Sequence, residues 1–197
     1  MKISKIHARL QKTFIGNFIV TPKPKQIEEP VVAVSPDILD GNPKSVSKKR
    51  VIFMGRDAVR QHKFNPTDVL ISISDTGTAP PILATQPLEV LPLAFHDYVS
   101  AIEFKEFGWR KMDSDDGVKI VEFVLKHEDC NNIIVHCNYG QSRSKAAAIA
   151  ISVMTGRSIL HSDDYGRIAQ YKESANSYYN RHVYGMILSE YECCQDN

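Results

Sequence analysis

A cysteine, a glycine, an arginine and a serine fall at fixed intervals in the stretch HCNYGQSRS, residues 136–144. The apolar run IIV before it predicts a buried strand, and the alanine-rich run KAAAIAISVMTG after it predicts a buried helix. A loop that leads from a strand into a helix lies next to the free N–H groups of the helix's first turn, and these donors favour an anion. The spacing therefore predicts a phosphate-binding loop formed by Asn138, Tyr139, Gly140, Gln141, Ser142 and Arg143.

Individual residues of this stretch have distinct expected roles. Gly140 lets the backbone turn through conformations that a side chain would forbid, so that successive N–H groups converge on phosphate oxygens. Arg143 offers a planar guanidinium fork to two of these oxygens. The same donors stabilise the thiolate of Cys137, which makes this residue a candidate nucleophile and not a buried structural thiol. His136 is expected to orient the loop through hydrogen bonds, because neighbouring side chains of a strand point to opposite faces and it cannot easily deprotonate Cys137.

The strands that must carry this loop are visible as short apolar runs. Such runs occupy residues 51–54, 68–74, 88–95 and 133–135, and the segments between them contain turn residues such as DTGTAPP. Helical patterns alternate with the later runs. Strands that alternate with helices predict a single α/β domain, with a central, mostly parallel sheet flanked by helices.

Four helices are expected in the second half of the chain. GVKIVEFVLKH places Val118, Val121 and Leu125 on one face at helical spacing, behind the capping carboxylates Asp115 and Asp116. The run KAAAIAISVMT should end at Gly156 as a C-cap. A third helix is expected to start near Ser162 or Asp163. The fourth covers RHVYGMILSEY, with Val183, Met186, Ile187 and Tyr191 on one face.

Composition and charge restrict the class of protein. The 197 residues contain 24 Lys plus Arg and 23 Asp plus Glu, which gives a formal net charge of +1. This balance provides no overall field for nucleic acid or an anionic membrane, so neither is expected as a partner. No window is apolar enough for a membrane span, and the N-terminus lacks the apolar core of a signal peptide, so a cytoplasmic protein is expected. The four cysteines show no CxxC spacing, and no metal or other cofactor is expected.

The domain boundary is expected near residue 48. Residues 1–48 contain segments rich in proline and lysine, such as TPKPKQIEEP, and predict an N-terminal extension without assigned chemistry. Residues 49–197 are expected to form the catalytic domain.

The fixed positions of the motif carry a family resemblance. HCxxGxxRS resembles the HCxxGxxR(S/T) motif of cysteine-based protein tyrosine and dual-specificity phosphatases, with every fixed position filled. The segments LISISDTG, VLPLAFHDY and ANSYYNRHVYGMIL, and the helix before IIVHC, are similar to small tyrosine-phosphatase-like proteins of bacteria and their viruses. The resemblance covers about residues 50 to 191 and implies the tyrosine-phosphatase fold.

The resemblance also implies a two-step hydrolysis. Cys137 attacks phosphorus, a cysteinyl-phosphate forms, and water hydrolyses it. By the same resemblance, Asp97 in AFHDY corresponds to the family's general acid, and Ser144 to the hydroxyl that eases departure of the thiolate. Three other aspartates lie closer to the cysteine in sequence, but helix capping alone explains their clustering. These rivals are Asp113, Asp115 and Asp116.

The expected substrate is phosphotyrosine in proteins, with phosphoserine or phosphothreonine as a further substrate. One alternative is a phosphatase of the same superfamily that acts on phosphoinositides or RNA 5′ ends, and another is a phosphate-binding module with little turnover. The loop lacks the extra lysines that highly charged substrates favour, since Lys145 is the only one nearby. Retention of nucleophile, arginine, hydroxyl and candidate acid favours an enzyme over a binding module.

Overall fold

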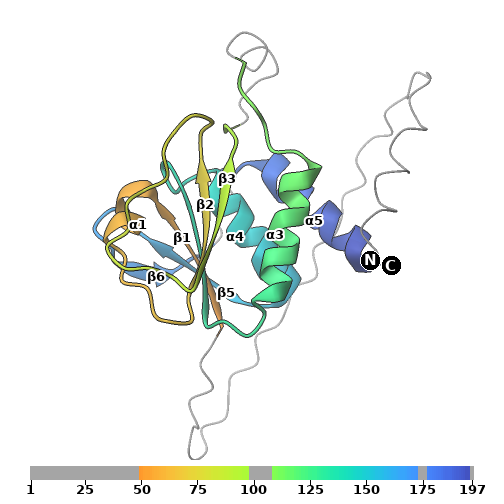
Figure 1. Cartoon of the computed structure of the whole chain (residues 1–197). Coiled ribbons are helices and arrows are strands. Elements are labelled where there is room, and N and C mark those ends of the chain that lie inside the picture. Colours follow the sequence, from red (N-terminus) through yellow and green to blue (C-terminus); the bar gives the residue numbers. More distant parts are fainter. Residues whose placement is uncertain (1–48, 98–107, 173–176, 196–197) are drawn as a thin grey trace, which may run out of the picture. The chain divides into compact units, whose positions relative to one another are not determined.

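The computed structural model describes residues 49–97, 108–172 and 177–195. All of them lie in one unit of the chain, Pro43–Asn197. The expected N-terminal extension, residues 1–48, lies outside the described residues. The described part contains a six-stranded sheet with helices on both faces (Figure 1). Its strands are β1 (Arg50–Gly55), β2 (Val69–Ser74), β3 (Glu89–Ala94), β4 (Asn132–Cys137), β5 (Ser158–Ser162) and β6 (Ile168–Gln170).

The sheet has the strand order β3-β2-β4-β1-β5-β6, and only the β5–β6 pair is antiparallel. All four strands predicted from the apolar runs are present, and the mostly parallel sheet is confirmed. The motif strand β4 lies between β2 and β1, so parallel strands flank the cysteine on both sides. In this register Gly55 lies opposite Cys137, and Ser72 lies opposite His136. The carboxyl ends of β1, β2, β3 and β4 therefore meet at one edge of the sheet.

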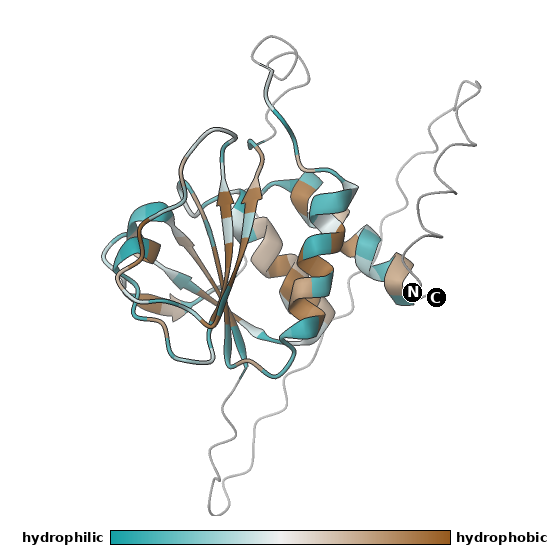
Figure 2. Cartoon of the chain, in the orientation of Figure 1, coloured by the Kyte–Doolittle hydropathy of each residue, from teal (hydrophilic) through white to brown (hydrophobic). Residues whose placement is uncertain are grey.

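The helices of the described residues cover the two faces of the sheet unequally (Figure 1). Alternate residues of each strand enter two separate cores, as Val51 and Phe53 do on one face and Ile52 and Met54 on the other. The central strands are strongly apolar (Figure 2), as expected for parallel strands that are buried on both faces. The helices are α1 (Arg56–Gln61) on one face, and α3 (Ser114–Lys126), α4 (Arg143–Thr155) and α5 (Arg181–Gln195) on the other.

The predicted helices over 145–156 and 181–191 are confirmed as α4 and α5. Gly156 ends α4 in the left-handed region, with φ 69°, as a C-cap glycine should. On α5, Val183 and Ile187 are fully buried, whereas Met186 and Tyr191 are half-buried. Within the described ranges, no helix combines the length and the apolar character needed to cross a membrane.

Two helix predictions need correction. The helix expected from Ser162 or Asp163 is wrong, because these residues end β5 and enter a tight turn into β6. In that turn the Asp163 carboxylate accepts hydrogen bonds from two backbone N–H groups and forms an ion pair with Arg167, which favours the turn over a helix start. On α3 the buried face is centred on Ile120 and Val124, and Leu125 is 42% exposed.

Candidate active site

Cys137 is the last residue of β4 and is buried, with 2% exposure. Its side chain belongs to the core on the three-helix face, whereas His136 points to the opposite face, as strand geometry predicts. The Cys137 Sγ lies 3.2 Å from the Ser144 Oγ on the first turn of α4. The structure thus brings the candidate nucleophile and the candidate hydroxyl into hydrogen-bond contact across the loop.

Gly140 is the position where the loop passes closest to a neighbouring strand. Its φ is 71°, and the backbone of Met54 and Gly55 at the end of β1 fills the space where a side chain would begin. An added Cβ would lie 2.6 Å from the Met54 carbonyl carbon and 3.0 Å from the Gly55 Cα. Glycine is therefore required here both by conformation and by space.

The substitution Gly140→Ala is expected to displace the loop from the end of β1. We expect a rate about 10²-fold lower, because a shift of about 1 Å misplaces the reacting groups. We also expect about 1–3 kcal/mol of lost stability from strain and overpacking. Gly156→Ala is the matched control, since Gly156 has φ 69° and nothing within 4 Å of its Cβ position. The control should lose stability but keep the rate, and equal rates in the two variants would contradict the assigned role of Gly140.

The N-cap side chain of α4 makes no hydrogen bond to the N–H groups of the helix's first turn. Ser142 is the N-cap residue, but its side chain makes no capping hydrogen bond to the helix. Its hydroxyl instead donates to Asp97 Oδ1 at 2.9 Å. Ser142 therefore gives the N–H groups of the first turn no side-chain acceptor, and the helix dipole makes this end attractive to an anion.

Arg143 is the first residue of α4, and two hydrogen bonds hold its side chain in place. Its side chain is 4% exposed, and Nη1 donates to Asp75 Oδ1 at 2.7 Å and to the carbonyl oxygen of Phe95 at 2.5 Å. The Nε atom is buried and has no hydrogen-bond partner among the described residues. A buried guanidinium N–H without an acceptor is costly, and an anion bound in the loop would provide the acceptor.

Asp75 is a site residue that the motif did not identify. It follows β2 directly, and its two oxygens accept from Arg143 Nη1 and, at 2.5 Å, from Asn138 Nδ2. One carboxylate therefore fixes both ends of the loop. The available signal was its place after a strand of a parallel sheet, where polar side chains gather at the edge that carries the loop.

Asp75→Asn is expected to lower the affinity for an oxyanion such as tungstate by about 10- to 100-fold, because an amide cannot accept from both donors and leaves the buried Arg143 without its counter-charge. Competition against an aryl phosphate substrate measures this. Asp163→Asn is the matched control, since Asp163 forms an ion pair with Arg167 at the same 2.7 Å and has a similar side-chain exposure, 31% against 32% for Asp75. Equal affinities in the two variants would show that Asp75 does not support the loop.

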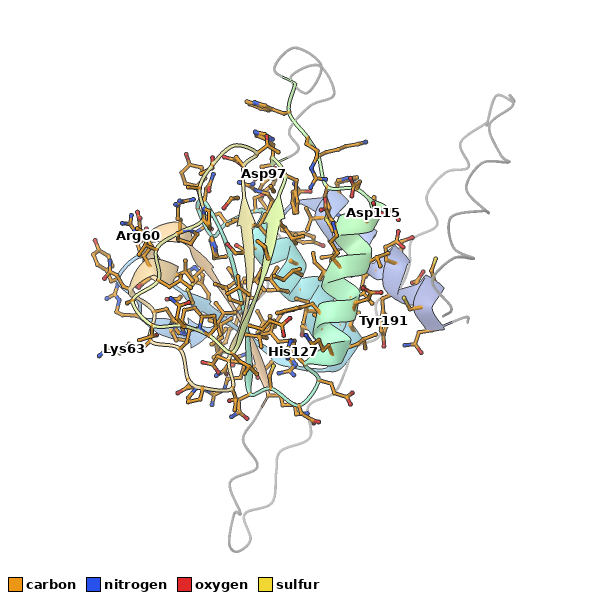
Figure 3. All side chains as sticks on the ribbon, in the orientation of Figure 1. Arg60, Lys63, Asp97, Asp115, His127 and Tyr191 are labelled. Carbon is orange, nitrogen blue, oxygen red and sulfur yellow. The ribbon has the colours of Figure 1, made fainter. Side chains whose placement is uncertain are left out.

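Asp97 lies beyond the carboxyl end of β3, at the edge of the sheet that carries the loop (Figure 3). Its Oδ1 accepts hydrogen bonds from Ser142 Oγ and, at 2.5 Å, from Asn180 Nδ2. The structure therefore brings the carboxylate expected from the resemblance into direct contact with the loop that is predicted to bind phosphate. Asn180 is a second residue that the motif did not identify.

Two of the three rival aspartates, Asp113 and Asp116, have structural partners. Asp113 is the N-cap of α3 and forms a capping box with Asp116. The helix therefore starts about one turn earlier than predicted. The predicted capping role is confirmed for Asp116 and is shared by Asp113. Arg110 pairs with Asp113 at 2.9 Å and with the buried Asp116 at 2.7 Å. Arg110 also donates through Nε to the carbonyl oxygen of Ala94. Asp115 is exposed on the first turn of α3 (Figure 3) and has no such contact with the loop.

His136 is fully buried and links two strands. Its Nε2 lies 2.7 Å from the Ser72 Oγ on β2. Burial lowers the pKa of His136 to about 4, and the nearby cations Arg56 and Arg143 act in the same direction. The ring is therefore neutral around pH 7 and fixes the end of β4, from which the loop departs. Its loop-orienting role stays a prediction.

The remaining loop side chains are turned toward solvent. Tyr139 is 82% exposed and Gln141 is also exposed, so these two positions are expected to bind an anion through their backbone N–H groups.

The four cysteines are free thiols. In the part of the chain that the structure describes, no group of three His, Cys, Asp or Glu side chains is arranged to hold a metal ion.

Comparison with known proteins gives no match for this chain: no family model, no curated protein and no solved structure matches it. The family resemblance therefore depends on the motif residues and on the arrangement of the groups around them.

Proposed function

We propose that the chain is a cysteine-dependent phosphomonoester hydrolase that acts on phosphotyrosine, and also on phosphoserine or phosphothreonine, in proteins. The observation that carries the proposal is the convergence of three groups on one loop. Cys137 Sγ contacts Ser144 on the first turn of α4, Arg143 has a buried Nε without an acceptor among the described residues, and Asp97 accepts a hydrogen bond from Ser142. A nucleophile, an anion site and a proton donor in this arrangement support phosphoryl transfer.

In the first step, the Cys137 thiolate attacks phosphorus and the P–O bond to the leaving group breaks. Asp97 gives its proton to the departing oxygen, so that an alcohol or phenol leaves, not its anion. The loop N–H groups and Arg143 stabilise the charge of the transferring phosphoryl group.

In the second step, a water molecule attacks the cysteinyl-phosphate and loses its proton to Asp97, which is now ionised. The P–S bond breaks, and the electron pair returns to Cys137. Ser144 can donate a hydrogen bond to the departing sulfur across the 3.2 Å contact. Phosphate is released with the enzyme in its starting state.

The charges around the loop favour a phosphoester of a protein over a polyanionic substrate. Lys145, the one lysine near the motif, is mostly buried, and its Nζ donates to the carbonyl oxygen of Tyr178 at 2.7 Å and lies over the Tyr171 ring. It therefore adds little charge to the mouth of the site. A phosphoinositide or a triphosphate-ended RNA would need further cations to bind tightly.

A substrate panel tests the proposal. An aryl phosphate, a phosphotyrosine peptide, a phosphoserine peptide, a phosphoinositide and a triphosphate-ended RNA are compared by kcat/KM under one set of conditions. We expect turnover of the aryl phosphate and the phosphotyrosine peptide, with a radioactive phosphoenzyme that survives denaturation of a quenched reaction. A higher kcat/KM for the phosphoinositide or the RNA would assign the site to those substrates, and binding of phosphate without turnover would make the chain a phosphate-binding module.

A further inference from the structure

Asn180 connects the start of α5 to the candidate acid. It is 4% exposed and precedes Arg181, the first residue of α5. Its side chain uses both ends: Oδ1 accepts from the backbone N–H of Val183 at 3.0 Å, and Nδ2 donates to Asp97 Oδ1 at 2.5 Å. The N-cap bond fixes the amide orientation, so the NH₂ group can only face away from the helix. The cap of one helix thus presents a donor to Asp97.

Two donors from separate elements converge on the same oxygen of Asp97. Ser142, at the start of α4, and Asn180, at the start of α5, both donate to Oδ1. An oxygen that accepts two hydrogen bonds is a poor place for a proton, because the proton would compete with both donors. The proton that leaves in catalysis must therefore be carried by Oδ2.

We propose that Asn180 is a positioning residue that fixes Asp97 with Oδ1 as the acceptor and Oδ2 as the proton donor. The inference rests on the proposed function, because it assigns Asn180 a part in the same proton transfer. Ser142 belongs to the phosphate loop and ties Asp97 to the site. Asn180 ties it to the helical layer, so the carboxyl group cannot rotate and exchange its two oxygens.

The substitution Asn180→Ser separates capping from positioning. Serine is as good an N-cap as asparagine, so its hydroxyl can keep the bond from the Val183 N–H. The shorter side chain has no amide donor to reach Asp97. Asn132→Ser is the matched control, because Asn132 Nδ2 donates to Asp68 Oδ1 at 2.7 Å in a similar contact at the amino end of β4.

We expect Asn180→Ser to lower kcat by about 10- to 100-fold for an aryl phosphate with a poor leaving group, as misplacement of a reacting group does. For an activated leaving group the loss should be less than about threefold, since little proton transfer is needed. Tungstate affinity should be unchanged, and Asn132→Ser should match the wild type in all three measurements. Equal losses for both leaving groups would overturn the positioning role.

The double variant gives a second test. If Asn180 acts through Asp97, adding Asn180→Ser to Asp97→Asn should cause no further loss with the poor leaving group. A full additional loss would mean that Asn180 acts elsewhere, and would overturn the inference.

A measurement that needs no turnover separates this inference from the proposed function. Amide hydrogen exchange of the peptide that contains Phe95, His96 and Asp97 should be faster in Asn180→Ser than in the wild type and in Asn132→Ser. If Asn180→Ser exchanges faster but the protein hydrolyses none of the esters, Asn180 does position Asp97 and the proposed function is wrong. Unchanged exchange in a chain that does hydrolyse them would overturn the inference alone.

Discussion

Cys137→Ser is expected to abolish turnover, with a loss on the order of 10⁴-fold or more, while the protein still binds an oxyanion. A serine hydroxyl is a far weaker nucleophile than a cysteine thiolate, so the proposed nucleophile is lost. The proposed anion site consists of the first turn of α4 and Arg143, and the substitution changes neither. Steady-state rates with an aryl phosphate and tungstate binding by calorimetry measure the two parts of this prediction.

Cys130→Ser is the matched control, because Cys130 is also a buried thiol associated with β4, near the opposite end of the strand. Its Sγ lies 3.6 Å from Arg157 Nη2 and 3.6 Å from the carbonyl oxygen of Asn132, away from the loop. The control should lose stability at most. Activity of Cys137→Ser within tenfold of the wild type would rule out Cys137 as the nucleophile.

The centre of the sheet could be predicted from sequence because β1, β2 and β4 are buried on both faces. β1, β2 and β4 are almost continuous apolar runs, and such runs identify a parallel sheet without any knowledge of the pairing. β5 and β6 were missed for the opposite reason. SILHS mixes polar and apolar residues and is mostly half-buried, and IAQ is exposed, so neither carries a regular hydrophobic period.

The site could be predicted only as far as the motif is contiguous. Cys137, Gly140 and Arg143 are close in sequence, and their spacing alone indicates an anion loop. Asp75 reaches Arg143 of the loop, and Asn180 reaches Asp97, only through tertiary structure, across 68 and 83 residues of sequence. Each carries only a local signal, the end of a strand and the start of a helix, so their function appears only when the sheet brings these ends together.

Asp97→Asn is expected to cost about 10²- to 10⁴-fold in kcat with a poor leaving group, and much less with an activated one. The substitution changes little else, because the amide oxygen of asparagine can accept the same two hydrogen bonds from Ser142 and Asn180. The rate across a series of aryl phosphates measures this. Its dependence on the leaving group should become steeper in the variant.

The pH dependence of the rate tests independently whether Asp97 donates the proton to the leaving group. The proposed mechanism uses the thiolate of Cys137 and the protonated carboxyl group of Asp97, so a bell-shaped pH profile with an acid limb and a basic limb is expected. His136 contributes no limb near neutrality, because burial lowers its pKa to about 4. Asp97→Asn has no carboxyl proton to lose and should keep the acid limb without the basic one.

Asp115→Asn is the control for these two measurements, because Asp115 is exposed and is the member of the rival cluster that takes no part in the capping box. It should match the wild type in both. Asp113→Asn and Asp116→Asn should instead lower stability, since they weaken the capping box and the pair with Arg110. If Asp97→Asn keeps the leaving-group dependence and the basic limb of the wild type, while one of these three variants shows a steeper dependence and no basic limb, the acid is that residue and the contact between Asp97 and Ser142 is structural.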